Sequence, residues 1–348
     1  MALVLDSLLT VGSRPVCSVC IANYNGESML ADCIDSVLLQ DCGFSIEIIV
    51  HDDASTDGSL SLLRSHYPQV RIIASAANVG FCIGNNRMVA AARGEFVLLL
   101  NNDAALLPGA LAAFAAEAAR QSSPAILTLP QYDWESGALV DRGCMLDPFY
   151  NPVPNTDPGR DDVAYVIGAC LWCPRTLWDF LGGFPEWIES IGEDLYLGCL
   201  ARTDGFTVVA LHQSGYRHRQ GASFGGNRLA AGRLQTTYRR RRLSERNKTF
   251  VLLLFTPSPF ATVLLALHLL VLMAEGAALS VLKRDPRLFR EVYWNVPQAL
   301  LSQGTRLLEL RRRVQGRRRI GILDYFRVFT PIPRKITMFL RHGLPSLR

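Results

Sequence analysis

The sequence predicts an α/β fold, built on a mostly parallel, Rossmann-like central sheet and followed by a basic helical region. Short apolar runs alternate with helix-like segments through residues 16–129, which is the rhythm of successive strand–helix units. A polar loop follows each of the first four runs. Positive charge is concentrated in residues 228–348, where long apolar stretches also occur. The first two observations predict the sheet and its functional edge, and the third predicts a second domain.

Each apolar run is expected to form one strand, and each segment between runs one helix. The predicted strands are Val16–Ala22, Ile46–Val50, Val70–Ala74, Phe96–Leu100 and Ala125–Leu129. The predicted helices are Met29–Gln40, Ser59–His66, Gly84–Ala92 and Pro108–Arg120. Ligands of parallel sheets bind outside the carboxyl ends of the strands, where loops carry the polar groups. The loops that follow the first four strands are therefore the candidate site.

Charge divides the chain into two parts. Residues 1–227 hold 12 Lys and Arg against 25 Asp and Glu, whereas residues 228–348 hold 24 against 6. With 348 residues and 49% hydrophobic composition, the chain is long enough for two cores. We therefore expect one domain at 14–227 and a basic, apolar, membrane-associating helical region at 228–348. An anionic membrane surface fits this block better than nucleic acid, because no recognisable nucleic-acid-binding module accompanies the arginines.

The nine cysteines are an odd number scattered through apolar runs, which is typical of a protein in a reducing compartment. The start of the chain lacks a basic segment and carries Asp6 within a short apolar run, so it does not predict a signal peptide. Cys17-x-x-Cys20 and Cys170-x-x-Cys173 have the spacing of a four-cysteine zinc site. Each pair lies in a strand-like run, however, where residues three apart point to opposite faces, so structural cysteines are the favoured interpretation.

The loop after the second predicted strand is rich in acids. Asp52 and Asp53 close a nearly pure apolar run, and Ser55, Thr56 and Asp57 follow them. The last three are good N-cap residues for the next helix, because their side chains accept hydrogen bonds from the N–H groups of a first helical turn. Capping does not account for Asp52 and Asp53, which leaves a solvated turn or a ligand contact as their role.

Four stretches, "VCSVCIANYNG", "EIIVHDDASTDGS", "NVGFCIGNN" and "GEFVLLLNND", resemble in order and spacing the nucleotide-sugar-binding half of the family 2 inverting glycosyltransferases, which have the GT-A fold. The resemblance covers roughly residues 14–225 and is closest to the rhamnosyltransferase-like members that build bacterial surface polysaccharides. It implies that Asp52 contacts the nucleotide base or ribose, with Asp53 close behind. The full set of residues that it implies for the nucleotide-sugar donor is Ala22, Tyr24, Asn25, Asp52, Asp53, Asn78, Gly80, Asn86, Asn101 and Asn102.

Asn101-Asn102-Asp103 stands where the family carries its Asp-x-Asp metal motif, and Asn101 replaces the first carboxylate. The resemblance implies that Asp103 binds a divalent cation, Mg²⁺ or Mn²⁺, on the donor diphosphate, with Asn101 as a weaker contact. One carboxylate is enough in principle, because such ions are often bound by one or two carboxylates together with substrate phosphates and water. The alternative role for Asp103 is to cap a helix.

The stretch from Gly168 to Phe206 resembles the acceptor-side segment of the same family. Within it, Glu193 and Asp194 precede a helical apolar pattern, where two acids would complement the positive end of the helix dipole. The resemblance implies instead that Asp194 is the catalytic base of an inverting single displacement. It places Gly168, Ala169 and Glu193 on the acceptor side. Pro185 departs from the family pattern, since relatives often have an acid there.

His218 completes the metal site that the resemblance implies, because the family has a histidine at this position that binds metal or diphosphate. Ser223 follows it, as in the family. Arg217 and Arg219 are candidate diphosphate partners, since guanidinium groups bind phosphate in a bidentate manner. His212 aligns less well, and a structural role is the alternative for either histidine.

The predicted function is a metal-dependent inverting glycosyltransferase, with dTDP-rhamnose the favoured donor and a UDP-sugar next. The acceptor is expected to be a glycan or a polyprenyl-diphosphate-linked glycan. The alternative is a catalytically weak or inactive nucleotide-sugar-binding protein of the same fold, because Asn101 replaces a carboxylate. A processive polysaccharide synthase is disfavoured, since the Gln-x-x-Arg-Trp signature is missing and the nearest string, "QTTYRR", has no tryptophan.

Phe260–Leu282 is an apolar segment of 23 residues, long enough to cross a membrane. Lys and Arg lie on both sides of it, so the positive-inside rule places both ends in the cytosol, which a single crossing cannot satisfy. His268 and Glu275 are seven residues apart and share one helical face. We therefore expect this segment to lie on or re-enter the cytoplasmic side of the inner (plasma) membrane. The alternative is a buried helix of a soluble domain.

Overall fold

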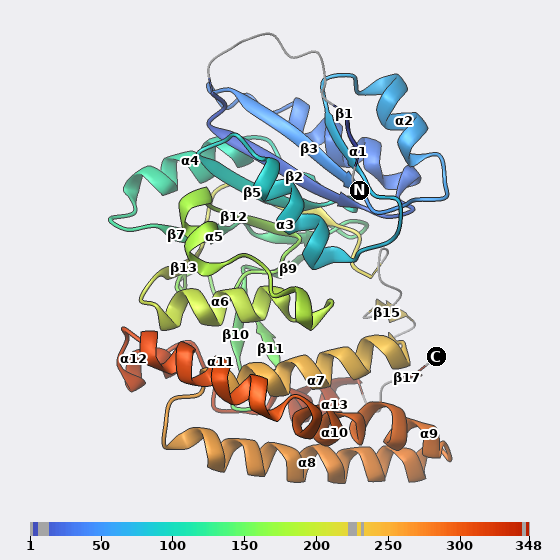
Figure 1. Cartoon of the computed structure of the whole chain (residues 1–348), viewed down its shortest axis with the longest axis vertical. Helices are drawn as coiled ribbons and strands as arrows, with labels where there is room; N and C mark the ends of the chain where they lie inside the picture. The colour runs from blue at the N-terminus through green and yellow to red at the C-terminus, as the bar shows by residue number, and fades with distance from the viewer. Residues whose placement is uncertain (1–2, 6–13, 222–227, 231–232, 343–345, 348) are drawn as a thin grey trace. The chain divides into compact units, whose positions relative to one another are not determined.

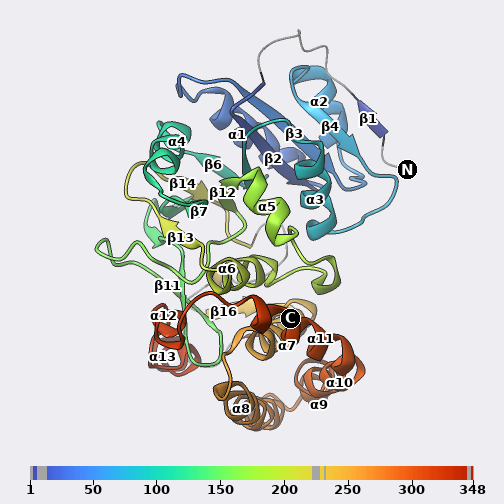
Figure 2. The ribbon, with the colours of Figure 1, turned by 60° about the vertical axis from the view of Figure 1, so that its left-hand side comes forward.

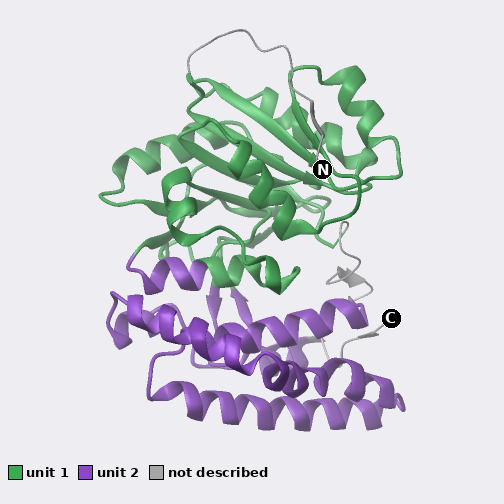
Figure 3. Ribbon diagram, viewed as in Figure 1, with its two compact units in different colours: residues 1–144, 154–197, 206–223 green, residues 145–153, 198–205, 224–348 purple. Residues whose placement is uncertain are grey.

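The computed structural model describes residues 3–5, 14–221, 228–230, 233–342 and 346–347. The chain divides into two compact units, coloured separately in Figure 3. Unit 1 is Met1–Cys144, Pro154–Leu197 and Phe206–Ser223, and unit 2 is Met145–Val153, Gly198–Gly205 and Phe224–Arg348. The predicted domain boundary at residue 227 lies outside the described residues. Unit 2 also takes two short segments from the part of the chain assigned to the first domain.

An eight-stranded sheet forms the centre of unit 1, with the strand order β1-β4-β3-β2-β5-β12-β7-β13 (Figure 1). The strands are β1 (Leu3–Leu5), β2 (Cys17–Asn23), β3 (Ile46–Asp52), β4 (Arg71–Ala74), β5 (Phe96–Asn101), β7 (Ala125–Thr128), β12 (Cys170–Pro174) and β13 (Thr207–Ala210). β4, β3, β2 and β5 are parallel, as are β7 and β13. β1 and β12 run antiparallel to their neighbours. The mostly parallel sheet is confirmed, and each predicted strand agrees within two residues at both ends.

Helices cover both faces of this sheet. The helices of this part of the chain are α1 (Glu27–Leu38), α2 (Ser59–His66), α3 (Phe81–Ala91), α4 (Ala110–Arg120) and α5 (Arg175–Leu181), with a 3-10 turn at Glu186–Ile188. α6 (Glu193–Thr203) belongs to unit 1 up to Leu197 and to unit 2 from Gly198. Strand side chains alternate between faces, so Val19 of β2 packs in one core cluster with Ile34 of α1 and Phe114 of α4. Figure 2 shows α3 on the other side of the sheet from α1. Each such side chain, when fully buried, stabilises the fold by about 1.5–3 kcal/mol.

The two Cys-x-x-Cys pairs are split between the faces of the sheet, as their spacing predicts. Cys17 and Cys170 belong to the core cluster on the α1 side, whereas Cys20 and Cys173 are buried outside that cluster. Burial raises the pKa of the Cys20 and Cys173 thiols. All nine cysteines lie within the described residues and are free thiols. They are therefore structural core residues.

A second, four-stranded sheet in unit 1 has the order β6-β14-β8-β9. Its strands are β6 (Ala104–Leu106), β8 (Gln131–Asp133), β9 (Leu139–Asp141) and β14 (Tyr216–His218), and β10 (Cys144–Leu146) pairs separately with β11 (Pro152–Pro154). β14 runs antiparallel to β6, with His218 opposite Ala104. This pairing brings His218 next to the residue that follows Asp103.

Unit 2 is mainly helical. Its helices are α7 (Tyr238–Phe255), α8 (Phe260–Leu282), α9 (Pro286–Leu288), α10 (Asn295–Ser302), α11 (Gly304–Arg317), α12 (Ile322–Phe326) and α13 (Arg334–His342), with a π-helical turn at Phe289–Tyr293. It also contains the short strands β15 (Arg228–Ala230), β16 (Arg233–Thr236) and β17 (Ser346–Leu347), and most of the β10–β11 pair. Leu272 and Leu279 of α8 pack with Val292, Tyr293 and Val296 in its hydrophobic core. The bounds of α8 are those of the apolar segment singled out in the sequence.

Candidate active site

The carboxyl ends of the central parallel strands meet at one edge of the large sheet. In the strand register, Ala22 of β2 lies opposite Asn101 of β5, and Asn23 lies opposite Asp52 of β3. The N–H of Asn101 donates to the carbonyl of Ala169, at 3.0 Å, just before β12 begins. Residues from the predicted donor loops and from the predicted acceptor segment therefore lie side by side.

Asp52 is completely buried, and its carboxylate serves the loops around it. Its Oδ2 accepts from the amide of Asn23 at 2.9 Å, and its Oδ1 accepts from the N–H of Ser55 at 3.0 Å. Asn23 in turn accepts from the amide of Asn102 at 2.8 Å, so one buried chain of hydrogen bonds links three strand ends. In this structure Asp52 and Asn102 shape the donor loops from inside, and their predicted contact with the nucleotide stays a prediction.

Asp53 holds the loop before α3. Its two carboxylate oxygens accept from the N–H groups of Val79 and Gly80, at 2.7 and 2.8 Å, and its side chain is 7% exposed. Gly80 has φ of +90°, a conformation that L side chains rarely adopt. The predicted site residue Asn78 is exposed beside them. Asp53 therefore does not lie in a solvated turn. Its buried carboxylate anchors the loop before α3.

Tyr24 and Asn25 form the first loop of the edge. Asn25 takes a left-handed conformation with φ of +49°, and its Oδ1 accepts from the N–H of Thr56 at 2.7 Å. Its own N–H donates to the Ser55 hydroxyl at 2.9 Å. Tyr24 next to it is 51% exposed, so its ring is free to meet a ligand. The expectation that Ser55 and Thr56 cap α2 is wrong, because both bond back to Asn25; Asp57 alone of the three accepts from Ser59 of α2.

Asp103 and His218 form a buried pair across the small sheet. Nε2 of His218 lies 3.0 Å from Oδ1 of Asp103, and the two residues are 8% and 2% exposed. They are 115 positions apart in the chain, and the pairing of β14 with β6 brings them together. The backbone carbonyl of Asp103 also accepts from the N–H of Arg219 at 2.9 Å. The structure therefore assembles the two residues predicted to hold the metal.

Gln131 is a site residue that the sequence did not reveal. Its Oε1 accepts from the hydroxyl of Tyr216 at 2.8 Å and lies 3.2 Å from Nδ1 of His218. An amide oxygen only accepts, so Nδ1 of His218 is the donor in this contact. Gln131 is fully buried at the start of β8. Only the parallel pairing of β8 with β14 reveals its role.

The pair fits a divalent ion such as Mg²⁺ or Mn²⁺. Neighbouring ligands of an octahedral ion, each about 2.1 Å from it, are about 3.0 Å apart. Asp103 and His218 lie 3.0 Å apart in a hydrogen bond, so their oxygen and nitrogen are close enough to bind one ion together. Among the described residues, no three His, Cys, Asp or Glu side chains gather as a metal cluster. Diphosphate oxygens and water would therefore supply the remaining ligands, as is usual for these hard ions.

A second buried acid lies close to the pair. Burial raises the pKa of Asp141, at the end of β9, to about 7, although the N–H of Gly143 and the imidazole of His218 act in the opposite direction. The carboxyl accepts from that N–H at 2.9 Å. Asp141 is therefore a second buried carboxyl beside His218, with an altered proton affinity.

Asp194 lies at the first turn of α6, as the apolar pattern predicts. Its Oδ2 accepts from the N–H of Gly168 at 3.1 Å, and its Oδ1 accepts from the N–H of Leu195 at 2.7 Å. Gly168 precedes Ala169, whose carbonyl bonds to Asn101. A short path of backbone contacts thus joins the predicted base to the metal motif. Glu193 beside it is 7% exposed.

Asn86 was predicted to contact the donor, and its side chain joins α3 to the acceptor segment. Its amide donates to the carbonyl of Phe184 at 2.9 Å, and its Oδ1 accepts from the N–H of the same residue at 3.0 Å. This closed pair of bonds anchors the Gly-Gly-Phe turn before Pro185. Asn86 is therefore placed to fix the acceptor segment against the donor side.

Arg219 is held in position by partners that the sequence did not reveal. Its guanidinium stacks on the ring of Trp134, 3.4 Å from the centroid, and pairs with Asp32 of α1 at 2.6 Å. Arg217 is exposed, and Ser223 lies outside the described residues. His212 pairs with Asp161 instead of joining the site. His212 therefore lies outside the Asp103–His218 pair, and the metal-binding role of His218 stays a prediction.

Residues 18–177 match the family model described as Glycosyl transferase family 2. This segment is a family 2 glycosyltransferase domain. It contains Asp52, Asp53 and the Asn101–Asp103 motif, while Asp194 and His218 follow it in the chain.

Two curated relatives are similar to part of this chain. Chondroitin synthase of Escherichia coli is 32% identical over 193 residues, which are 54% of this chain and 27% of that protein. The N-acetylglucosaminyl-diphospho-decaprenol L-rhamnosyltransferase of Mycobacterium tuberculosis is 25% identical over 210 residues, 52% of this chain and 68% of the relative. The chain thus spans only about a quarter of the synthase.

Among solved structures, S. aureus TarS 1-349 in complex with UDP-GlcNAc superposes with a TM-score of 0.52 and 17% identity, over 89% of each chain. At that identity the likeness shows the fold alone. The family 2 domain therefore has the GT-A fold that the sequence resemblance implies.

Proposed function

We propose that this chain is a metal-dependent, inverting glycosyltransferase that moves a sugar from a nucleotide diphosphate to a glycan or polyprenyl-diphosphate-linked glycan at the cytoplasmic face of the membrane. The observation that carries the proposal is the Asp103–His218 pair at 3.0 Å, connected through Asn101, Ala169 and Gly168 to Asp194. A relative named for rhamnosyl transfer to a decaprenol-linked sugar favours dTDP-rhamnose as donor. A UDP-sugar is the next candidate, since TarS was crystallised with UDP-GlcNAc.

In the proposed reaction, Asp194 takes the proton of the acceptor hydroxyl while the acceptor oxygen forms its bond to the anomeric carbon. The bond from that carbon to the diphosphate oxygen breaks, and the nucleotide diphosphate leaves with the electron pair. Attack on the face opposite the leaving group inverts the anomeric configuration. A divalent ion held by Asp103 and His218 would supply charge neutralisation for the diphosphate. Arg219, fixed by Asp32 and Trp134, places a further positive charge next to His218.

The competing proposal is a nucleotide-sugar-binding protein without activity, because Asn101 replaces a carboxylate of the metal motif. Hydrolysis of dTDP-rhamnose and of UDP-sugars with added Mn²⁺ or Mg²⁺ separates the two. A thermal-shift screen of nucleotide diphosphates with Mn²⁺ identifies the nucleotide, since a ligand at a hundred times its Kd adds about 2.7 kcal/mol of stability. Binding without any turnover of a donor would favour the inactive protein.

Replacing Asp52 by Ala is expected to raise the KM for the donor more than it lowers kcat. The buried carboxylate holds Asn23 and Ser55, so its loss loosens the donor loops without removing a reacting group. The partners left unpaired should also lower the stability by about 1–3 kcal/mol. Steady-state kinetics and thermal unfolding measure both effects. Asp52→Asn, which keeps one acceptor, should be milder, and a collapse of kcat at constant KM would instead place Asp52 in the chemistry.

Replacing Gln131 by Met is expected to weaken Mn²⁺ binding by about 10–100-fold, the usual cost of losing an outer partner of a metal-bound histidine. The change keeps the side-chain volume but removes the acceptor for Nδ1 of His218. Electron paramagnetic resonance titration of Mn²⁺ in the presence of nucleotide diphosphate measures the affinity. ¹⁵N NMR of the His218 ring should show loss of the Nδ1–H tautomer. His212→Gln is the control, and equal Mn²⁺ affinity in wild type and Gln131→Met would rule out this positioning role.

A further inference from the structure

We infer that unit 2 binds the surface of an anionic lipid bilayer through the outward face of α8, with the helix lying in the membrane plane. The inference deepens the proposed function, because it names how the chain reaches a lipid-linked acceptor. Its evidence comes from unit 2 alone.

The outward face of α8 is apolar along the whole helix. Its large exposed side chains are Phe260, Val263, Leu267, Leu270, Val271, Val281 and Leu282, which are 41–77% exposed. The other exposed positions of α8 are alanines and one threonine. Within the described residues, α8 is the one helix long and apolar enough to cross a membrane, yet only 22% of its most apolar window is buried. A core helix of a soluble domain would be mostly buried, so that alternative does not describe α8.

The two titratable side chains of α8, His268 and Glu275, face the interior of unit 2. Nε2 of His268, a residue 3% exposed, lies 2.8 Å from the hydroxyl of Thr249 in α7. Glu275 accepts from Arg241 at 2.7 Å and from the hydroxyl of Tyr293 at 3.2 Å. His268 and Glu275, which were predicted to share one face of this helix, therefore contact other helices. The apolar face of α8 is left outside.

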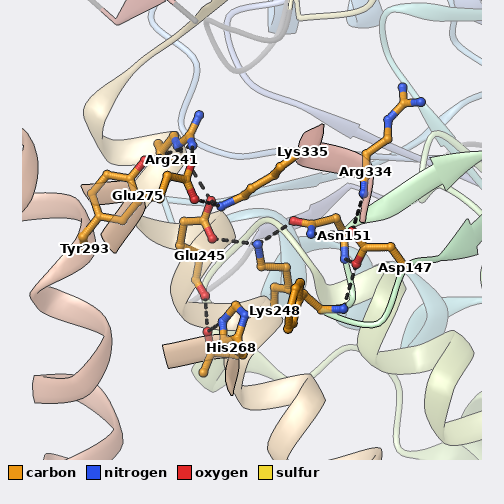
Figure 4. A network of polar contacts seen from close by, with 12 residues as sticks. Asp147, Asn151, Arg241, Glu245, Lys248, His268, Glu275, Tyr293, Arg334 and Lys335 are labelled. Carbon is orange, nitrogen blue, oxygen red and sulfur yellow. Dashed lines mark hydrogen bonds and ion pairs between the residues drawn. The ribbon is translucent and has the colours of Figure 1, made fainter. Parts of the chain in front are cut away.

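Behind α8 the interior of unit 2 is unusually charged (Figure 4). Glu245 of α7, 4% exposed, pairs with Lys248 at 2.6 Å and with Lys335 of α13 at 2.7 Å. Burial alone would raise the pKa of Glu245, but the two ammonium groups hold it well below its usual range. Lys248 also donates to Asn151 at 2.6 Å. Arg241 and Lys248, two of the cations that precede the apolar segment, are thus engaged in ion pairs inside unit 2.

The paired charges behind α8 and the apolar outward face of α8 depart from the usual arrangement of a water-soluble domain. Contiguous exposed apolar surface marks an interaction site, and buried charges are costly unless paired as they are here. The network ties the inner sides of α7, α8 and α13 together through Lys335, which reaches both Glu245 and Glu275. It therefore holds the polar side of α8 inward and leaves its apolar side for a nonpolar surface.

The charge around this face selects an anionic bilayer as its occupant. Arg284, Arg287 and Arg290 follow α8 directly and are exposed. α13 adds a second amphipathic helix, on which Ile336, Phe339 and Leu340 are 53–77% exposed while Lys335 is engaged inside. Basic residues next to an apolar helical face are typical of helices that lie in the headgroup region of anionic membranes.

An in-plane helix also fits the ion pairs better than a crossing one. A helix of 23 residues is about 34 Å long, enough to span the hydrocarbon layer. If α8 crossed, its inner face would carry Glu275 and the bound charges of α7 into hydrocarbon, where each ionised group costs several kcal/mol. Lying in the plane, α8 buries its leucines while the network stays on the protein side.

The first test is flotation of the purified full chain with vesicles of equal parts phosphatidylcholine and phosphatidylglycerol. The chain should float with these vesicles. Val263→Asp with Leu270→Asp should weaken binding at least about tenfold, because two apolar side chains would enter the bilayer as charges. Leu38→Asp with Leu39→Asp, the same change at exposed leucines of unit 1, is the matched control and should float like wild type.

Arginine variants test the lipid charge. Arg284→Gln, Arg287→Gln and Arg290→Gln should each weaken binding to these vesicles about fivefold, and binding to pure phosphatidylcholine much less. Unchanged thermal unfolding and donor hydrolysis in every variant would show that the chain stays folded. Equal flotation of the Val263/Leu270 double variant and wild type, or no flotation of wild type, would overturn the proposal. Neither outcome depends on glycosyl transfer, so failure here is distinct from failure of the proposed function.

The second test measures depth. Spin labels placed in turn at positions 263, 270 and 281 should all report similar, shallow depths near the headgroup boundary. If α8 crosses, the label at position 270 would lie near the bilayer centre and the other two near opposite surfaces. That pattern would overturn the in-plane orientation even if the vesicles bind.

Discussion

Asp194→Asn is expected to lower glycosyl transfer by about 10²–10⁴-fold, the usual contribution of a general base, while donor binding stays nearly intact. The amide keeps the shape of the side chain and can still accept from the N–H of Gly168, so the turn at the start of α6 should remain. It cannot take the proton of the acceptor hydroxyl. Transfer rates under single-turnover conditions and donor affinity by calorimetry give the two quantities.

Asp179→Asn is the matched control for this result, because Asp179 is an exposed acid of α5 in the same unit. It should transfer at the wild-type rate. Full activity of Asp194→Asn would show that another group is the base. A parallel loss of donor binding would show that Asp194 acts by holding Gly168.

Asp103→Ala is expected to weaken nucleotide binding strongly when Mn²⁺ or Mg²⁺ is present and little when metal is absent. It removes the charged member of the metal pair, so the loss should exceed the roughly 10–100-fold typical of an outer partner. Nucleotide affinity measured with metal and with a chelator separates the two conditions. Asp133→Ala, at the register position opposite His218 in β8, is the control. An equal loss with and without metal would mean that Asp103 supports the fold instead.

The sheet could be predicted from the sequence because its signals are local. Val16–Ala22 and Phe96–Leu100 are apolar runs bounded by polar loops. The approximate lengths of the strands and helices follow from such runs. β12 is the exception. "CLWCP" is strand-like in sequence, but its place between β5 and β7, antiparallel to both, depends on pairing across more than forty residues.

The roles of Asp52 and Asp53 could be predicted from the sequence only in part. The sequence marked Asp52 and Asp53 as unusual, since capping did not explain them. It did not show that both are buried and hold Asn23, Val79 and Gly80 by hydrogen bonds. Burial depends on neighbours from other strands, and these neighbours are distant in the chain.

The sequence by itself determined the strand–helix order, the polar loops at the strand ends and the bounds of the apolar segment Phe260–Leu282, because each is a property of a short run of residues. Tertiary structure decided which distant groups meet. The pairing of β14 with β6 and β8 put His218 between Asp103 and Gln131. The packing of α7, α8 and α13 turned Glu275 and His268 inward and left leucines outside. Hydrogen bonds and ion pairs act over a few ångströms in space, so separation along the chain carries little information about them.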